Sequence, residues 1–268
     1  MPELPEVETT RRGIAAHVTG RRIRAVVVRN PALRWPVPKG LAQRLVKRSV
    51  RAVRRRGKYL LLDVDGGSVI VHLGMSGSLR IVRASDAPRR HDHLDIVFDD
   101  GRALRLHDPR RFGAVLWSER PEAHRLLRGL GPEPWDASAE YLYRRSRGRR
   151  QAVKSFIMDS RTIVGVGNIY ASESLFEAGI RPRRGAGRVS FEEYARLAAA
   201  IVKVLERSIR LGGTTLRDFV SATGEPGYFR QTLGVYERQG LPCRNCGTAI
   251  KRLVMVGRAS YYCPRCQR

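Results

Sequence analysis

The chain has 268 residues, of which 42% are hydrophobic, and its 51 Lys and Arg outnumber 25 Asp and Glu to give a net charge of +26. That length and apolar content allow a sizeable core and exclude a wholly disordered protein. The longest apolar runs are too short to cross a bilayer, and the acidic first residues are not typical of a secretory signal. We therefore expect a globular cytoplasmic protein, without a membrane partner, whose positive charge meets nucleic acid.

Residues 3–17 predict a helix, because acidic residues stand in the first turn and arginines follow, as the helix dipole favours. Removal of Met1 would leave Pro2 with a free secondary amine. α-Amino groups have pKa values near about 8, so a fraction is nucleophilic at neutral pH, and Glu3 is a candidate acid or base beside it. The alternative is a frayed N-terminus whose acids only complement the dipole.

Eight short segments rich in Val, Ile and Leu follow, separated by turns that contain Gly, Pro or Asp. Short strands at this spacing are typical of an antiparallel sandwich or barrel, not of alternating strands and helices. We place this first domain at residues 1–120. The predicted strands are 22–29, 51–55, 59–64, 68–73, 79–82, 93–98, 103–106 and 113–117.

Helical patterning begins in the second half of the chain. Residues 121–150 contain Gly-Pro turns and a run of arginines, which is typical of an interdomain connection. Residues 151–240 are expected to form a helical domain, and its last helix begins with a capping box at Ser190. The predicted helices are 151–158, 168–178 and 190–211.

The turn at residues 162–170 joins two of these helices. Gly165 and Gly167 allow the backbone close to a phosphate, and Asn168 can cap the next helix while neighbouring amides face the anion. An ordinary glycine-rich turn between helices fits the same residues equally well.

All four cysteines lie at the C-terminus, in two C-x-x-C pairs separated by 16 residues: Cys243, Cys246, Cys263 and Cys266. Four thiolates can surround one tetrahedral zinc ion, and the gap fits a β-hairpin over 249–262 that turns near Gly257 and Arg258. Two disulfides or a redox pair are the alternatives, and a cytoplasmic chain disfavours the first. We expect one structural zinc ion in a separate unit at 241–268.

Six motifs, taken in chain order, resemble the bacterial formamidopyrimidine-DNA glycosylase family. They are PELPEVE at 2–8, KYLLL at 58–62, HLGMSG at 72–77, DPRRFG at 108–113, GVGNIY at 165–170 and the four-cysteine hairpin. The resemblance implies an α+β fold: an N-terminal antiparallel β-sandwich with an N-terminal helix, then a helical domain with a helix-two-turn-helix motif and the zinc-finger hairpin. It also implies a monomeric repair enzyme, associated with the bacterial nucleoid, that removes oxidised purines from damaged double-stranded DNA and cuts the strand by β- and δ-elimination.

The resemblance assigns four catalytic roles. It implies that Pro2 forms a Schiff base with the sugar and that Glu3 protonates the departing base or the sugar oxygen. Lys58 would be a proton donor or phosphate contact in β-elimination, and Arg258 would serve δ-elimination. Because arginine stays protonated, Arg258 is better interpreted as a phosphate clamp. In isolation, Lys58 and Arg258 would be ordinary exposed cations.

Further residues are implied to bind DNA. Met75, Arg110 and Phe112 would fill the gap left by the flipped nucleotide, although the sequence alone favours Met75 and Phe112 as core residues. The remaining contacts implied by the resemblance are His91, Arg149, Lys154 and Asn168. His91, Asp92 and His93 also form a metal-like trio, for which the resemblance favours phosphate contact. Residues 217–228 match a loop over the lesion base.

Two other functions remain open from sequence. The sister family of endonuclease VIII shares Pro2, Glu3 and the zinc hairpin but prefers oxidised pyrimidines, and the context of Leu4 and the Arg-Arg-Phe wedge favour the purine enzyme. A non-catalytic zinc protein would need the charge and the hairpin to bind DNA, but would not need Pro2 and Glu3.

Overall fold

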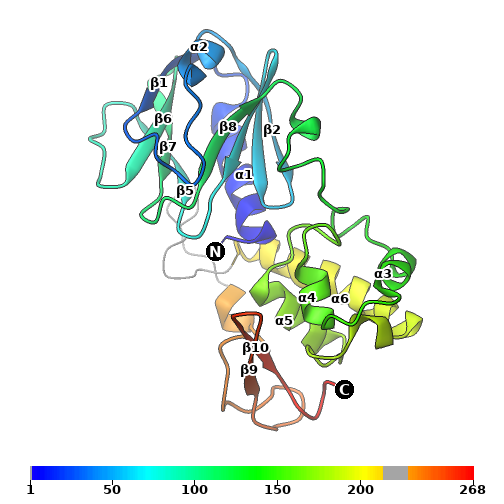
Figure 1. Cartoon of the computed structure of the whole chain (residues 1–268). Helices are drawn as coiled ribbons and strands as arrows, with labels where there is room; N and C mark the ends of the chain where they lie inside the picture. The colour runs from blue at the N-terminus through cyan, green and yellow to red at the C-terminus, as the bar shows by residue number, and fades with distance from the viewer. Residues whose placement is uncertain (1, 214–228) are drawn as a thin grey trace. The chain divides into compact units, whose positions relative to one another are not determined.

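The computed structural model describes residues 2–213 and 229–268 (Figure 1). The segment 217–228, predicted to lie over the lesion base, falls outside the described residues. The chain divides into two compact units, one formed by the described residues of 1–128 and 211–230 and the other by 129–210 and 231–268. The sequence predicts four parts, with boundaries at residues 120, 150 and 240, and this division stays a prediction.

The first unit contains two four-stranded antiparallel sheets. One has the order β1 (Ile23–Val28), β6 (Asp92–Phe98), β7 (Arg102–His107), β5 (Ser78–Arg83). The other has the order β2 (Val50–Arg56), β3 (Tyr59–Val64), β4 (Gly67–His72), β8 (Ala114–Ser118). Apolar side chains of both sheets share one buried core, so the predicted sandwich and its eight strands are confirmed, with ends shifted by at most one residue.

The N-terminal helix α1 (Leu4–Val18) packs against β2 and β5, which are edge strands of different sheets. Val7, Ile14 and Val18 project from it into the shared core. The helix therefore covers sandwich edges that would otherwise present unpaired backbone groups to other chains. A short helix, α2 (Leu41–Leu45), packs on β1 and was not predicted.

The second unit is helical, with a C-terminal hairpin. Its helices are α3 (Ala139–Ser146), α4 (Val153–Met158), α5 (Asn168–Glu177) and α6 (Phe191–Arg210), and its strands are β9 (Lys251–Met255) and β10 (Arg258–Tyr262). The capping box of α6 is confirmed, since the Ser190 Oγ accepts from the Glu193 N–H at 3.2 Å and Glu193 Oε2 accepts from the Ser190 N–H at 2.9 Å. Of the short 3-10 helices, η2 (Ala186–Arg188) lies in this unit, η1 (Pro121–Ala123) lies in the first unit, and η3 (Phe229–Thr232) has residues in both.

Helix α3 lies inside the region that the sequence predicts as a connection. Ser138 caps it by accepting a hydrogen bond from the Tyr141 N–H, and Leu142 and Ser146 are its buried residues. The helix is short and rich in arginine, so its sequence shows little apolar periodicity. For this reason the sequence did not predict it. Across the described residues, no helix is both long and apolar enough to cross a membrane.

Candidate active site and zinc site

The first turn of α1 is ordered and buried. Glu3 is the N-cap of the helix and is 3% exposed, and its N–H donates to Glu6 Oε2 at 2.8 Å in a reciprocal capping box. Pro2 is buried as well. The sequence left open a frayed N-terminus, but from Pro2 onward the chain is folded. The backbone nitrogen of Pro2 therefore has a defined position.

Glu8 anchors the same helix to the sandwich. Its carboxylate accepts hydrogen bonds from Arg11 at 2.8 Å, from Arg12 at 2.8 Å and from Arg55 of β2 at 3.1 Å. Burial acts to raise the pKa of Glu8, but the hydrogen bonds and charges of these arginines outweigh it and lower the pKa to about 2. Glu8 is thus ionised at neutral pH and holds α1 on β2.

One end of the second sheet gathers several predicted residues. Tyr59 pairs with His72 in the ladder, and His72 pairs with Ala114. Lys58, which precedes Tyr59, therefore lies at the same sheet end as the connections 73–77 and 108–113, which carry Met75 and Arg110 with Phe112. Neighbouring strands are about 5 Å apart, so this pairing brings all three segments together.

His72 sits at the centre of this sheet end as a neutral ring. Burial lowers its pKa to about 4, and the positive charges of Lys58 and Arg34 add to the effect. Its Nδ1 accepts the Gly74 N–H at 3.0 Å and its ring centroid is 4.9 Å from that of Tyr59. Because the ring is neutral, Nδ1 keeps a lone pair and can accept the hydrogen bond from Gly74, at the start of the connection that carries Met75.

Met75 and Phe112 are exposed, contrary to what the sequence alone favours. Met75 is 38% and Phe112 is 42% exposed, and the Arg110 guanidinium carbon lies 4.8 Å from the centre of the Phe112 ring. Large apolar side chains beside a cation at a sheet end are suited to wedging between bases. The interpretation of these two residues as core is wrong, because each sits in a connection and not on the inner face of a strand.

The trio of His91, Asp92 and His93 does not form a metal site. Asp92 binds Arg80 and His107, each at 2.8 Å, while the His93 Nε2–H donates to a backbone carbonyl. Among the described residues, the four cysteines are the one cluster arranged to hold a metal. His91 has a positive φ of 75°, and desolvation and the charge of Arg90 lower its pKa.

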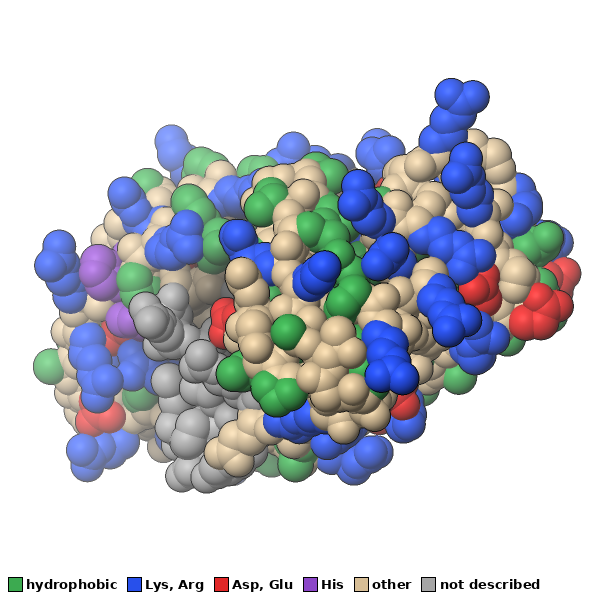
Figure 2. Space-filling model, turned by 90° about the horizontal axis from the view of Figure 1, so that it is seen from below, with side chains coloured by type: hydrophobic (Ala, Val, Ile, Leu, Met, Phe, Trp, Pro, Cys, Tyr) green, Lys and Arg blue, Asp and Glu red, His purple; other side chains and the backbone are tan. Residues whose placement is uncertain are grey.

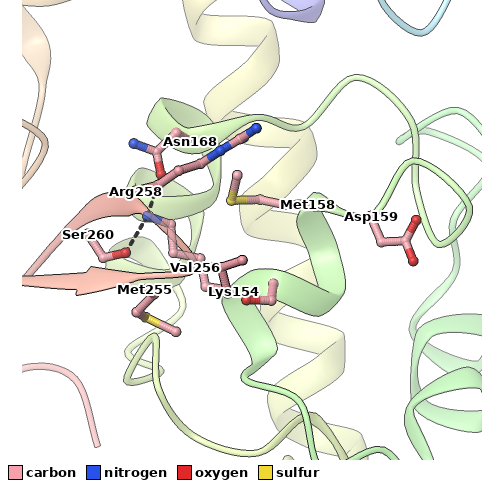
Figure 3. Close-up of a pocket in the computed structure, with 9 residues that line it drawn as sticks. Lys154, Met158, Asp159, Asn168, Met255, Val256, Arg258 and Ser260 are labelled. Atoms are coloured by element: carbon pink, nitrogen blue, oxygen red, sulfur yellow. Dashed lines mark hydrogen bonds between the residues drawn. The ribbon is translucent and has the colours of Figure 1, made fainter.

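In the second unit, Lys154 is buried where α4, α5 and the hairpin meet (Figure 3). Its Nζ donates to Asn168 Oδ1 at 2.7 Å and to Ser260 Oγ at 2.7 Å. Asn168 Nδ2 donates to the Ala259 carbonyl at 2.9 Å. The expected capping role of Asn168 is wrong: Gly167 is the N-cap of α5, and the Asn168 amide instead joins the helix to β10.

Arg258 borders a cavity of about 270 Å³ beside this cluster (Figure 3). Lys154, Asn168 and Met255 also line it. The hairpin turns at Val256 and Gly257, whose φ angles are 48° and 70°. This turn is one residue earlier than expected, so Arg258, which is exposed, is the first residue of β10.

Arg149 is exposed and is not among the residues that line this cavity. Figure 2 shows Lys and Arg side chains spread over the face seen from below, where acids are few.

The four cysteine sulfurs match a zinc site. They lie within 4.8 Å of one another, with Cys243 to Cys266 at 3.9 Å and Cys246 to Cys263 at 3.5 Å. Zinc–sulfur bonds of about 2.3 Å at tetrahedral angles place sulfurs roughly 3.8 Å apart. A disulfide bond requires two sulfurs about 2.05 Å apart, so the alternative of two disulfides is wrong. The chain therefore holds one structural zinc ion, bound by all four thiolates.

A sandwich with a buried amino-terminal turn and a helical unit with a zinc hairpin are the two halves of one class of protein, the helix-two-turn-helix DNA glycosylases. Family models match residues 1–115 (formamidopyrimidine-DNA glycosylase N-terminal domain), 130–220 (formamidopyrimidine-DNA glycosylase H2TH domain) and 240–268 (zinc finger found in FPG and IleRS). The chain belongs to the formamidopyrimidine-DNA glycosylase family, whose activities are base excision and cleavage at abasic sites.

Three relatives illustrate the similarity. A formamidopyrimidine-DNA glycosylase of Thioalkalivibrio sulfidiphilus is 61% identical, with 100% of each chain covered. A crystal structure of the Lactococcus lactis Fpg mutant G226P with DNA containing Fapy-dG matches with a TM-score of 0.92 at 30% identity, covering 100% of each chain. The MutM (Fpg) structure from Thermus thermophilus matches with a TM-score of 0.88 at 39% identity, covering 99% of this chain and 98% of that one. The predicted family and α+β fold are confirmed.

Proposed function

We propose that this glycosylase removes oxidised purines from damaged double-stranded DNA and that Pro2 is its nucleophile. The observation that carries the proposal is the buried, capped first turn of α1, in which buried Pro2 directly precedes the N-cap residue Glu3. A purine substrate is supported by the L. lactis relative, which was crystallised with DNA containing Fapy-dG.

The chemistry follows from these two groups. After loss of Met1, the Pro2 nitrogen bonds to C1′ of the damaged nucleotide while the bond from C1′ to the base breaks, and Glu3 supplies the proton that the departing base or ring oxygen needs. The C1′–O4′ bond of the sugar ring then breaks, O4′ takes up a proton, and the secondary amine is left as a cationic iminium that draws electrons. Loss of a proton from C2′ then expels the 3′ phosphate, and a second elimination expels the 5′ phosphate.

Two cations are proposed to serve the eliminations. Lys58 is a proton donor or phosphate contact in the first one, supported by its position at the sheet end that also carries Met75. Arg258 stabilises the leaving phosphate in the second one, supported by its exposure at the start of β10. A permanently charged guanidinium suits a clamp on a phosphate better than a proton donor.

The remaining residues are proposed to hold and open the duplex. Met75, Arg110 and Phe112 fill the gap of the flipped nucleotide, and the exposure of both apolar side chains supports this. The proposed phosphate contacts are His91, Arg149, Lys154 and Asn168. Lys154 is almost fully buried, so its contribution is to orient Asn168 and the hairpin as well as to place a positive charge.

Exchange of Glu3 for Gln tests the catalytic assignment. Base removal from a duplex containing 8-oxoguanine should fall by about 100-fold or more, because the proton donor is gone, whereas nicking of a preformed abasic site stays measurable. Glu6→Gln is the matched control, since a glutamine can still accept the Glu3 N–H. If Glu3→Gln leaves both activities unchanged, the proposed role of Glu3 is wrong. Faster turnover of thymine glycol than of 8-oxoguanine would contradict the purine substrate.

We also propose that the protein acts as a monomer in the cytoplasm, at the nucleoid. Sedimentation of the protein with a lesion duplex should give one chain per duplex. Two chains bound to one lesion would contradict the monomer.

A further inference from the structure

Two connections of the sandwich cross between its sheets in opposite directions. The connection 73–77 leads from β4 in the second sheet to β5 in the first, and 108–113 leads from β7 in the first to β8 in the second. They touch through their backbones: a Cβ added to Gly74 would lie 2.4 Å from the Phe112 carbonyl carbon. Gly74 also has a φ of 64°, which glycine adopts most easily.

One buried carboxylate binds both connections. Asp108 is 0% exposed; its Oδ1 accepts from the Ser76 hydroxyl at 2.9 Å and its Oδ2 accepts from the Gly113 N–H at 2.7 Å. The Ser76 oxygen in turn accepts from the Arg110 N–H at 3.3 Å. The chain of hydrogen bonds therefore runs from one connection to the other and back. We call these two side chains, Asp108 and Ser76, the loop clasp.

The backbone of Asp108 is fixed to the first sheet. Its N–H donates to the His91 carbonyl at 3.0 Å, and its own carbonyl accepts from His93 Nε2 at 2.8 Å. Because both backbone polar groups of Asp108 are hydrogen-bonded, its carboxylate is held in place and resists displacement of one connection relative to the other. The contacts favour a single rigid position for the two connections.

The chemistry of Asp108 suits this task better than that of an amide. A carboxylate group can accept hydrogen bonds on both oxygens, and here the Ser76 hydroxyl and the Gly113 N–H each donate to it. An asparagine has one acceptor oxygen: if that oxygen accepts from the Gly113 N–H, the NH2 group faces Ser76, and the buried hydroxyl loses the acceptor for its proton. The side chains of Met75 and Phe112, one in each connection, remain exposed.

We propose that Asp108 and Ser76 are positioning residues that lock the Met75 and Phe112 connections into one rigid wedge, so that they control opening of the duplex and not the chemistry at the sugar. This inference rests on the proposed function, which assigns Met75, Arg110 and Phe112 to the gap in the duplex. A rigid wedge costs little conformational entropy when it enters the base stack.

The test compares Asp108→Asn with Asp95→Asn, a second buried carboxylate of the same sandwich, which binds Arg29 and Arg105. Two activities are measured for each variant: base removal from a duplex with 8-oxoguanine, and elimination at an abasic site in single-stranded DNA, where no stacked duplex must be opened. Fluorescence of 2-aminopurine placed opposite the lesion follows opening directly.

Asp108→Asn should slow base removal and the fluorescence change by about 10- to 100-fold, the effect of a lost charged hydrogen bond, and change single-strand elimination by less than about threefold. Asp95→Asn should lower the melting temperature without changing the ratio of the two activities. Ser76→Ala should act like Asp108→Asn with a smaller effect, and it carries the same test if Asp108→Asn does not fold.

An equal loss of both activities in the clasp variants, or no loss in either, overturns the inference. In the background of Phe112→Ala, Asp108→Asn should add little, because the wedge is already lost; full additivity also overturns it. If Phe112→Ala in the natural chain leaves duplex opening unchanged, the proposed wedge fails instead, so the two failures are distinguishable.

Discussion

The sandwich and the zinc hairpin each carry side chains that we propose contact DNA, but different forces hold the two regions in place. The loop clasp is supported by one large core to which both sheets and α1 contribute. The hairpin has a small cluster around Val235, Cys243, Ile250 and Cys263, and it exposes Val254 and Val256. In the sandwich, a large core supports the two connections, and one buried carboxylate is enough to bind them together. The hairpin unit is so small that it needs a metal ion to stay folded.

Loss of zinc should separate the two regions most strongly. Metal binding supplies on the order of 10 kcal/mol to small zinc units, so Cys263→Ser or chelation should unfold residues 241–268 and weaken DNA binding while the sandwich stays folded. Amide hydrogen exchange, measured segment by segment, checks this. Re-addition of zinc to the chelated natural chain is the control and should restore protection. Unchanged protection of β9 and β10 in metal-free protein would contradict the metal's role.

Exchange of Glu8 for Gln tests how charge holds α1 on the sandwich. The folded pKa of Glu8, about 2, lies below its ordinary value of 4.5, so its stabilisation is present above 4.5 and is lost as pH falls towards 2. At neutral pH Glu8→Gln should lower the free energy of unfolding by about 1 to 3 kcal/mol, and this difference should shrink in acid. Denaturant unfolding of the sandwich at several pH values measures it.

Glu140→Gln is the control for charge, because Glu140 and Arg144 form an exposed pair on α3. It should change stability by less than about 0.5 kcal/mol. A Glu8→Gln effect of equal size at neutral and acid pH would point to packing and not to ionisation.

The smallest expected effect is at the tip of the hairpin. Val256 has a φ of 48°, which is strained for a β-branched residue, and it is followed by Gly257 in a two-residue turn. Val256→Asn creates the Asn-Gly pair that such turns favour and should stabilise the zinc-bound hairpin by about 1 kcal/mol, or about fivefold in apparent zinc affinity. Val254→Asn, on the adjacent strand, is the matched control and should not stabilise. A gain at both positions would contradict backbone strain as the cause.

Local signals made most of the fold predictable. Apolar segments bounded by turns predicted all eight sandwich strands, and the spacing of the cysteines predicted the hairpin. Helix α3 was missed because Leu142 is its one large buried apolar residue. The exposure of Met75 and Phe112 was not predictable from composition, because both look like core residues until their connections are placed.

The sequence named candidate residues for the site, but it did not predict how they are arranged. Asn168 was expected to cap a helix, and the structure instead joins it to Ala259, 91 residues along the chain. Asp108 attracted no role from sequence, although it opens the DPRRFG motif, because its partner Ser76 is 32 residues away. Contacts at such separations depend on which strands pair, and no local pattern contains that information.

Covalent trapping at Pro2 tests the central claim most directly. The natural chain is incubated with an 8-oxoguanine duplex in the presence of borohydride, which reduces an iminium to a stable amine, and the adduct is located by peptide mapping after intact mass has established whether Met1 is absent. The account predicts one adduct, on the nitrogen of Pro2, in protein that lacks Met1. An adduct on a lysine, or no adduct with the lesion duplex, would contradict it.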